Sequence, residues 1–407
     1  MKKNIIVGQS GGPTAVINAS LYGVIHEGLA HPEEIGCVYG MINGIEGFLA
    51  DKYMNLSSEL SEEELELLKL TPAAYLGSCR FKLPEDLSSE FYSTLFKKLE
   101  HMNIGAFFYI GGNDSMDTVS KLSRYARGIG SGIRFIGIPK TIDNDLVLTD
   151  HTPGYGSAAR YVASTVREIT LDASVYQQKS VTIVEIMGRH AGWLTAASVL
   201  ARKCEGDNPL LIYLPEAPFE FEQFAKDLKR AFEKNNNVIV CISEGIVDSA
   251  GHFICEYSSE AQLDTFGHKM LTGSGKILEN YIRNQFHVKV RSVELNVSQR
   301  CSGMCVSATD IEEAALAGKT GVISALAGET GKMVAFQRKD TEKYTMECSL
   351  VDVNKVCNLE KTFPADWITE HGTDIGPEFL AYALPLIQGD VSRRMENGLP
   401  VYLFRKE

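Results

Sequence analysis

The sequence lacks several features that would assign it to a common class of protein. It has no apolar run of the roughly 18 residues that a membrane-spanning helix requires, and its first residues do not form the apolar core and cleavage site of a signal peptide. It also has no basic stripe, and its net charge of −12 argues against nucleic-acid binding, which requires positive charge. We therefore expect no membrane and no nucleic acid as partners.

Cysteine pairs with metal-binding or redox spacing are missing too. The nine cysteines form no CxxC pair, and the closest two, Cys301 and Cys305, stand beside no cluster of histidines. This scatter favours free thiols in a reducing compartment, with a metal or redox site as the alternative. The predicted location is the cytoplasm.

What the chain does contain is an alternation of short apolar runs and helical segments. Its 407 residues are too many for one typical core, so two domains are expected. Strands are predicted at Asn4–Val7, Ala106–Ile110, Ile133–Ile138, Val181–Ile186, Leu210–Leu214 and Val238–Ile242. Helices are predicted at Ala15–Gly28, Met116–Tyr125, Ser157–Ile169, Gly192–Ala201, Phe221–Asn235, Leu271–Asn284 and Ile311–Ala327. The pattern predicts an α/β fold of two doubly wound, Rossmann-like lobes with mostly parallel sheets.

The domain boundaries follow from where this pattern breaks. We place the main division near residues 145–158, which predicts a first lobe at 1–150 and a second at 151–302. Residues 303–407 are predicted to add helices and an antiparallel ribbon (Met333–Arg338 with Tyr344–Val356) that pack back on both lobes.

Ligands of open α/β sheets bind at the carboxyl ends of the strands, in the cleft where the strand order reverses. After the first predicted strand stand Gly11 and Gly12, and a helix follows. Glycines let the backbone approach a phosphate, whose charge the helix N-terminus stabilises. A tight turn that binds nothing is the alternative, because the string matches neither GxGxxG nor GxxxxGK[ST].

The next two strand ends in the first half are also polar. Asn113 and Asp114 open a helix that they could simply cap, but their oxygens could also bind Mg²⁺ beside a phosphate. The following strand ends in Lys140, Asp143 and Asp145. A solvated turn would explain these residues. Alternatively, an aspartate there could take the proton of a substrate hydroxyl while the lysine binds phosphate.

The second half repeats the arrangement with different chemistry. Arg189 follows one strand and suits phosphate, with a surface ion pair as the alternative, and the adjacent His190 is interpreted as structural. Glu244 follows another strand and could accept hydrogen bonds from sugar hydroxyls. Arg291 and Arg300 flank an apolar alternation, and their spacing leaves open whether they are merely solvated.

Taken together, these strings resemble the phosphofructokinase family over most of residues 4–327. The resemblance rests on the following motifs: Gly11-Gly12, Leu76-Gly77-Ser78-Cys79-Arg80, Gly111-Gly112-Asn113-Asp114-Ser115, Pro139 through Asp145, Met187-Gly188-Arg189, Glu244 and Gln299-Arg300. It implies Mg²⁺-dependent phosphoryl transfer to the 1-hydroxyl of fructose 6-phosphate, with the first lobe on the donor side and the second on the sugar side.

The resemblance also implies individual roles. Asp143 would be the general base, with Thr141 and Asp145 close to the transferred group. The sugar phosphate would be held by Thr141, Asp143, Met187, Gly188, Arg189, Glu244 and Arg300. Arg291 would reach the 6-phosphate bound to a neighbouring subunit, which implies a homodimer or homotetramer. Asn113 and Asp114 would hold the metal, although the family commonly has Asp where Asn113 stands and His where Val297 stands.

The donor is predicted from two positions. ATP-dependent members have Gly where Asp114 and Lys140 stand, whereas pyrophosphate-dependent members have Asp and Lys, as here. The Asp114 carboxylate would repel the α-phosphate of a nucleotide, and Lys140 would balance the charge of the small pyrophosphate ion. Gly11, Gly12 and Arg80 would complete the pyrophosphate site, and the reaction is expected to be reversible.

Three alternatives remain at this stage. An ATP-dependent 6-phosphofructokinase is opposed by Asp114 and Lys140. A non-catalytic regulatory subunit of the same family is opposed by Asp143, while Asn113 keeps it open. A nicotinamide dehydrogenase would need GxGxxG after the first strand, which is missing.

Overall fold

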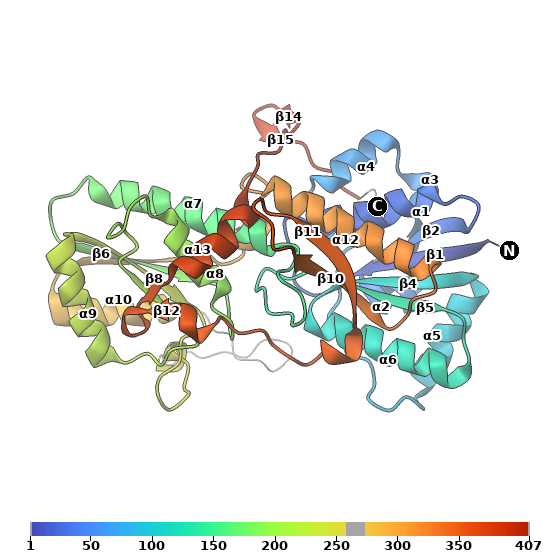
Figure 1. Ribbon diagram of the computed structural model, residues 1–407, viewed down its shortest axis with the longest axis horizontal. Coiled ribbons are helices and arrows are strands. Elements are labelled where there is room, and N and C mark those ends of the chain that lie inside the picture. The colour runs from blue at the N-terminus through green and yellow to red at the C-terminus, as the bar shows by residue number, and fades with distance from the viewer. Residues whose placement is uncertain (1, 258–272, 406–407) are drawn as a thin grey trace.

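The strands lie in two separate sheets, one in each lobe (Figure 1). The computed structural model describes residues 2–257 and 273–405. The first sheet has the order β11-β10-β5-β4-β1-β2-β3, with β3 and β11 antiparallel to their neighbours. Its strands are β1 (Lys3–Gln9), β2 (Ile35–Met41), β3 (Tyr53–Asn55), β4 (Ile104–Gly111), β5 (Arg134–Pro139), β10 (Lys332–Arg338) and β11 (Met346–Asp352).

The second sheet has the order β7-β8-β6-β9 and is parallel throughout. Its strands are β6 (Ser180–Ile186), β7 (Leu211–Tyr213), β8 (Asn237–Ser243) and β9 (Lys289–Glu294). Two small antiparallel pairs lie nearer the C-terminus: β12 (Ile368–Thr369) with β13 (Asp374–Ile375), and β14 (Met395–Glu396) with β15 (Leu399–Pro400).

Helices cover both faces of each sheet, which is why the central strands are apolar throughout (Figure 1). On the first sheet, α1 (Ile17–Ala30) and α12 (Ala308–Leu326) pack on one face, while α5 (Glu90–His101) and α6 (Asn113–Ile129) pack on the other. On the second, α7 (Tyr155–Ser174), α8 (Trp193–Ala196) and the 3₁₀ helix η1 (Ala197–Ala201) face α9 (Phe221–Lys234) and α10 (Ser274–Phe286) across the strands.

Shorter helices complete the fold. They are α2 (Gly44–Leu49), α3 (Leu56–Glu59), α4 (Glu62–Lys69), α11 (Ser298–Cys301), α13 (Pro377–Ala383) and the 3₁₀ helices η2 (Ile254–Tyr257), η3 (Val353–Lys355), η4 (Ala365–Trp367), η5 (Glu370–Gly372) and η6 (Leu384–Ile387). None of the helices within the described ranges is both long and apolar enough to cross a membrane.

The predicted α/β class is confirmed, and the differences are local. Strands β2 and β9 escaped prediction, because β2 contains two glycines and β9 is only half-buried. The predicted helix Gly192–Ala201 is one short α-helical turn followed by a 3₁₀ turn. The predicted helix Leu271–Asn284 begins at Ser274, and its residues 271 and 272 lie outside the described ranges.

The predicted antiparallel ribbon is β10 paired with β11, and it extends the first sheet because β10 also pairs in parallel with β5. Helix α12 packs on α1, whereas Phe379 of α13 lies in the core of the second lobe. Elements after residue 303 therefore lie on both lobes. The exact domain boundaries stay a prediction.

A buried histidine joins these C-terminal elements to the end of the first lobe. The side chain of His151 is almost fully buried between two carboxylates, with Nδ1 2.8 Å from Asp150 Oδ1 and Nε2 2.6 Å from Glu313 Oε2. The Phe336 ring also packs against it. Burial opposes protonation, but the hydrogen bonds and charges of the two carboxylates outweigh it and raise the pKa of His151.

This raised pKa predicts how stability depends on pH. A histidine whose pKa is raised by folding stabilises the fold fully below its unfolded pKa of about 6.5. That contribution is lost as the pH rises through the folded pKa. We expect the melting temperature of the native chain to exceed that of His151→Gln by the largest amount below about pH 6.5. This difference in melting temperature should shrink towards pH 9. A difference that grows with pH would contradict the ionised form of His151.

Candidate active site

A cavity of about 510 Å³ lies where the carboxyl ends of the two sheets face each other, and we call it the cleft. The predicted site residues that line it are Gly11, Gly12, Arg80, Asn113, Asp114, Lys140, Thr141, Asp143, Asp145, Met187, Arg189, Glu244 and Arg300. Gly188 lies between two of these in sequence, and only Arg291 lies elsewhere. Three strand ends of the first sheet and three segments of the second lobe therefore meet in one place.

The turn after β1 is held by the loop that carries Arg80. Gly11 N donates to Cys79 O at 3.2 Å, and Ser78 Oγ donates to Gly11 O at 2.7 Å. Gly11 has a φ of +76°, which a residue with a side chain rarely adopts. A Cβ added to Gly12 would lie 3.2 Å from Arg300 Nη1. The glycines thus let the turn approach a cation of the opposite lobe.

The turn after β4 places two oxygen-bearing side chains at the start of α6. Asn113 Nδ2 donates to the Leu359 carbonyl at 2.8 Å, whereas its Oδ1 is buried and has no hydrogen-bond partner among the described residues. Asp114 lies in the first turn of α6, where the helix dipole favours negative charge, and is exposed to the cleft. One buried orphan oxygen and one carboxylate therefore share the donor side.

Lys140, directly after β5, is buried and extends back across the β1 turn. Its Nζ donates to Gly12 O at 2.7 Å. Burial lowers the pKa of Lys140 to about 8, although the charges of Asp143 and Asp145 oppose the shift. The ammonium is thus held beside the backbone groups that suit phosphate oxygens.

The loop that follows presents Asp143 to the same space. Asp143 N donates to Thr141 Oγ1 at 3.1 Å, and Thr141 Oγ1 lies 3.4 Å from Asp143 Oδ2. Asn144 adopts a left-handed φ of +56°, which turns the chain between the two aspartates. Burial raises the pKa of Asp143 against the opposing charges of Lys140, Arg300 and Arg189. A buried carboxyl with a raised pKa is suited to exchanging a proton.

The pKa values of Asp145 and Glu244 are also raised. Burial, followed by the charge of Asp143, raises the pKa of Asp145 to about 7. The same two causes raise the pKa of Glu244 to about 8. Since each carboxyl responds to Asp143, the three acids form one electrostatic group in the cleft.

The second lobe contributes a turn that two side chains hold in place. Gln299 Oε1 accepts from Met187 N at 3.2 Å, and Glu244 Oε1 accepts from Gly188 N at 3.4 Å. Gly188 has a φ of +135°, and it turns the chain so that Met187 and Arg189 both line the cleft.

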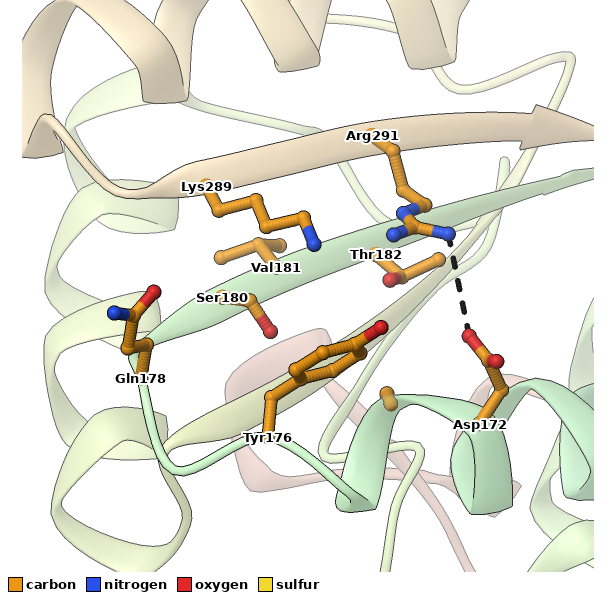
Figure 2. A pocket seen from close by; sticks show the side chains of 9 residues that line it. Asp172, Tyr176, Gln178, Ser180, Val181, Thr182, Lys289 and Arg291 are labelled. Atoms are coloured by element: carbon orange, nitrogen blue, oxygen red, sulfur yellow. Dashed lines mark ion pairs between the residues drawn. The ribbon is translucent and has the colours of Figure 1, made fainter.

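Arg291 lies apart from the cleft, on β9, in a small pocket with Lys289 and Tyr176 (Figure 2). Its side chain is 50% exposed, and its Nη1 is 4.0 Å from Asp172 Oδ2. Within one chain, therefore, Arg291 does not join the other predicted site residues.

Some residues of the cleft were not predicted from the sequence. Phe81 and Lys82 follow Arg80, and Glu360 comes from the segment after β11, to which the sequence assigned no role. His190, interpreted as structural, also lines the cleft. Glu360 does not directly follow a strand and belongs to no periodic segment, so only the folded chain shows where it lies.

The chain is similar to known proteins over most of its length. A family model described as Phosphofructokinase matches residues 4–324. The chain is 39% identical to a pyrophosphate–fructose 6-phosphate 1-phosphotransferase of Rhodospirillum rubrum, over 99% of this chain and 100% of that protein. It is 33% identical to a sulfofructose kinase of Alkalicoccus urumqiensis, over 90% of this chain and 92% of that protein.

A solved structure shares the fold over the whole length. The crystal structure of a pyrophosphate-dependent phosphofructokinase from Nitrosospira multiformis matches with a TM-score of 0.90 and 33% identity, covering 99% of this chain and 96% of that one.

Proposed function

This chain belongs to the phosphofructokinase family, and we propose that it transfers a phosphoryl group from pyrophosphate to the 1-hydroxyl of fructose 6-phosphate. The products are fructose 1,6-bisphosphate and phosphate, and the reaction runs in both directions. The observation that carries this proposal is that Asp114 and Lys140 share one cleft with Asp143. At these two positions the chain resembles the pyrophosphate-dependent members of the family, which have Asp and Lys.

Asp143 is the general base of the proposed reaction. It takes the proton of the 1-hydroxyl as that oxygen bonds to the phosphorus atom, while the bond from phosphorus to the bridging oxygen of pyrophosphate breaks. Thr141 fixes the orientation of Asp143. Asp145 and Arg189 line the same cleft, and we assign them the role of adjusting the charge around the transferred group. Catalysis then rests mainly on positioning and on charge stabilisation.

Pyrophosphate binds on the side of the first lobe. The Gly11–Gly12 backbone and the cations of Lys140 and Arg80 spread its charge. At an effective dielectric near 20, an ammonium about 4 Å from a phosphate charge attracts it by roughly 4 kcal/mol. Asp114 in the same cleft repels the additional phosphate of a nucleotide.

The residues of the donor side also fit a magnesium ion. Asn113 supplies a buried oxygen that no described residue contacts by a hydrogen bond, and Asp114 supplies a carboxylate. Two protein oxygens suffice, because Mg²⁺ keeps several waters and binds substrate phosphates. When bound, the ion would neutralise phosphate charge.

Fructose 6-phosphate binds on the side of the second lobe. The cations of Arg189 and Arg300 attract its phosphate, and Glu244 and the turn at Met187 and Gly188 contact the sugar. We place the reaction in the cytoplasm, which the nine free cysteines support.

We further propose that Arg291 completes the sugar-phosphate site of a second copy in a homodimer or homotetramer. Leu171 at the end of α7 and the two residues that follow this helix, Val175 and Tyr176, are exposed beside this pocket and form an apolar surface for a second copy to bury. Besides the pair of Arg291 and Asp172, the pocket contains Lys289, so its lining carries a net positive charge (Figure 2).

Replacement of Arg291 tests this assignment. Arg291→Ala is expected to raise the KM for fructose 6-phosphate about tenfold with little change in kcat, because a lost phosphate contact of about 1.4 kcal/mol weakens binding by that factor. Arg283→Ala, on α10 and paired with Glu279, is the matched control. A chain that light scattering shows to be monomeric while it binds fructose 6-phosphate normally would refute the role.

Phosphorus NMR of the native chain with pyrophosphate, Mg²⁺ and fructose 6-phosphate tests the reaction itself. The expected result is loss of pyrophosphate with equal gains of fructose 1,6-bisphosphate and phosphate, reversed when the products are supplied. No turnover with pyrophosphate or ATP would favour the regulatory subunit instead.

A further inference from the structure

The segment 357–363, which we call the strap, crosses from one lobe to the other (Figure 1). Its Glu360 lines the cleft. Before it, η3 is fixed to the first lobe by a 2.7 Å hydrogen bond between Ser120 Oγ and Asn354 Oδ1. At its end, Phe363 is buried against Trp193 in the core of the second lobe. The strap is therefore anchored at both ends.

The backbone of the strap contacts cleft turns of both lobes. Leu359 O accepts from Asn113 Nδ2 at 2.8 Å, at the start of α6. Phe363 N donates to Glu216 Oε1 at 2.7 Å, and the same oxygen accepts from Gly192 N, at the end of the turn that contains Arg189, at 2.9 Å.

Lys361 makes the most extensive contacts of the strap. Its Nζ, which can donate three hydrogen bonds, lies 2.7 Å from Asp150 O, 3.2 Å from Thr149 O and 3.5 Å from Asn144 Oδ1. Its own backbone N donates to Asp145 O at 2.7 Å. Lys361 thus contacts both ends of the loop that follows β5.

The surroundings of Lys361 fix where its ammonium lies. Trp193 Nε1 donates to Lys361 O at 3.0 Å, and the Nζ lies 4.9 Å from the centre of the Trp193 ring. Burial lowers the pKa of Lys361 to about 8. A side chain that carries this desolvation cost needs its acceptors in place. The loop and the ammonium therefore hold each other in one arrangement.

We propose that Lys361 is a positioning residue that holds the loop 141–150, and with it Asp143, in the geometry for phosphoryl transfer. This role rests on the proposed function for its chemistry, although the loop geometry can be measured without it. The residue nearest to Asp143 in this network is Asn144, whose Oδ1 faces Lys361 and whose Nδ2 donates to Tyr382 OH at 2.8 Å. Residues from the C-terminal part of the chain thus hold the aspartate loop from two directions.

Lys361→Met tests the role, because methionine retains the length of the side chain but donates no hydrogen bond. Loss of the loop geometry is expected to lower kcat with pyrophosphate about tenfold to a hundredfold, while the KM for fructose 6-phosphate changes less than about threefold. Amide exchange of residues 141–150 is expected to become faster. Lys361→Gln keeps one donor group, so its kcat and its amide exchange at 141–150 should lie between those of the native chain and those of Lys361→Met.

The matched control is Lys121→Met. Lys121 is also a buried lysine, with Glu85 at 2.6 Å and Asp117 at 2.7 Å, but it lies outside the cleft. This variant is expected to melt at a lower temperature with unchanged kcat and unchanged exchange at 141–150.

The exchange measurement separates the two proposals. If the native chain does not use pyrophosphate but Lys361→Met speeds exchange at 141–150, the proposed reaction fails and the positioning role stands. If Lys361→Met or Lys361→Gln behaves like Lys121→Met, with a lower melting temperature and unchanged kcat and loop exchange, the positioning role is refuted.

Discussion

Asp143→Asn is expected to lower kcat about a thousandfold, within the range of 10²–10⁴ that general bases contribute. Asparagine has nearly the shape of aspartate but cannot accept a proton under these conditions. The hydrogen bond from its backbone N to Thr141 Oγ1 does not depend on the carboxylate and can remain. Steady-state kinetics with pyrophosphate and fructose 6-phosphate would measure the loss. The KM values should change little, because asparagine can still form a hydrogen bond with the sugar and the other binding groups stay in place.

The pH profile supplies a second measurement at Asp143. Burial raises the pKa of Asp143, and only the ionised carboxylate can accept a proton. The rate of the forward reaction should therefore fall as the pH decreases through this raised pKa, and Asp143→Asn should lose that dependence. A tenfold or smaller loss of kcat would contradict the role of Asp143 as the base.

Asp114→Gly/Lys140→Gly is expected to lower kcat/KM for pyrophosphate about a thousandfold, because an attraction of roughly 4 kcal/mol is lost. Loss of Lys140 removes a buried cation from the donor site, and pyrophosphate has no base or ribose contacts to compensate. Loss of the Asp114 carboxylate removes the repulsion of a nucleotide. The ratio of kcat/KM for ATP over pyrophosphate should therefore rise.

A matched pair controls for the double replacement. Asp51 and Lys98 form an ion pair at 2.7 Å in the same lobe, away from the cleft, and Asp51 already has a left-handed φ of +60° that glycine accepts. Asp51→Gly/Lys98→Ala should leave the donor preference unchanged. An unchanged preference in Asp114→Gly/Lys140→Gly would mean that other residues select the donor.

The sequence could predict this site because its residues follow strands. Gly11, Asn113 and Lys140 lie in the turns that follow β1, β4 and β5, and the carboxyl ends of these parallel strands lie at one edge of the sheet. The strand order then decides which turns are neighbours. Here β1, β4 and β5 are adjacent, so the three turns share one cavity.

The strap could not be predicted in this way. Lys361 contacts Asn144 across 217 positions of sequence, and neither a strand end nor a helical period identifies the segment. Strand β9 was missed because its half-buried alternation differs from the continuous apolar runs of central strands. Contacts that depend on tertiary packing alone leave no local pattern in the sequence.

Arg291 is a predicted site residue that lies outside the cleft of its own chain. The resemblance assigns it to a sugar-phosphate site, yet it lies in a separate pocket with Lys289 and Tyr176. The role that we propose for Arg291 is therefore tested only by measurements on the oligomer.

The most direct test of the central claim is kcat/KM of the native chain for pyrophosphate and for ATP, each with Mg²⁺ and saturating fructose 6-phosphate. The pairing of Asp114 with Lys140 in the cleft predicts efficient turnover with pyrophosphate and little or none with ATP. Turnover with ATP as efficient as with pyrophosphate, or more so, would contradict the assignment of the donor.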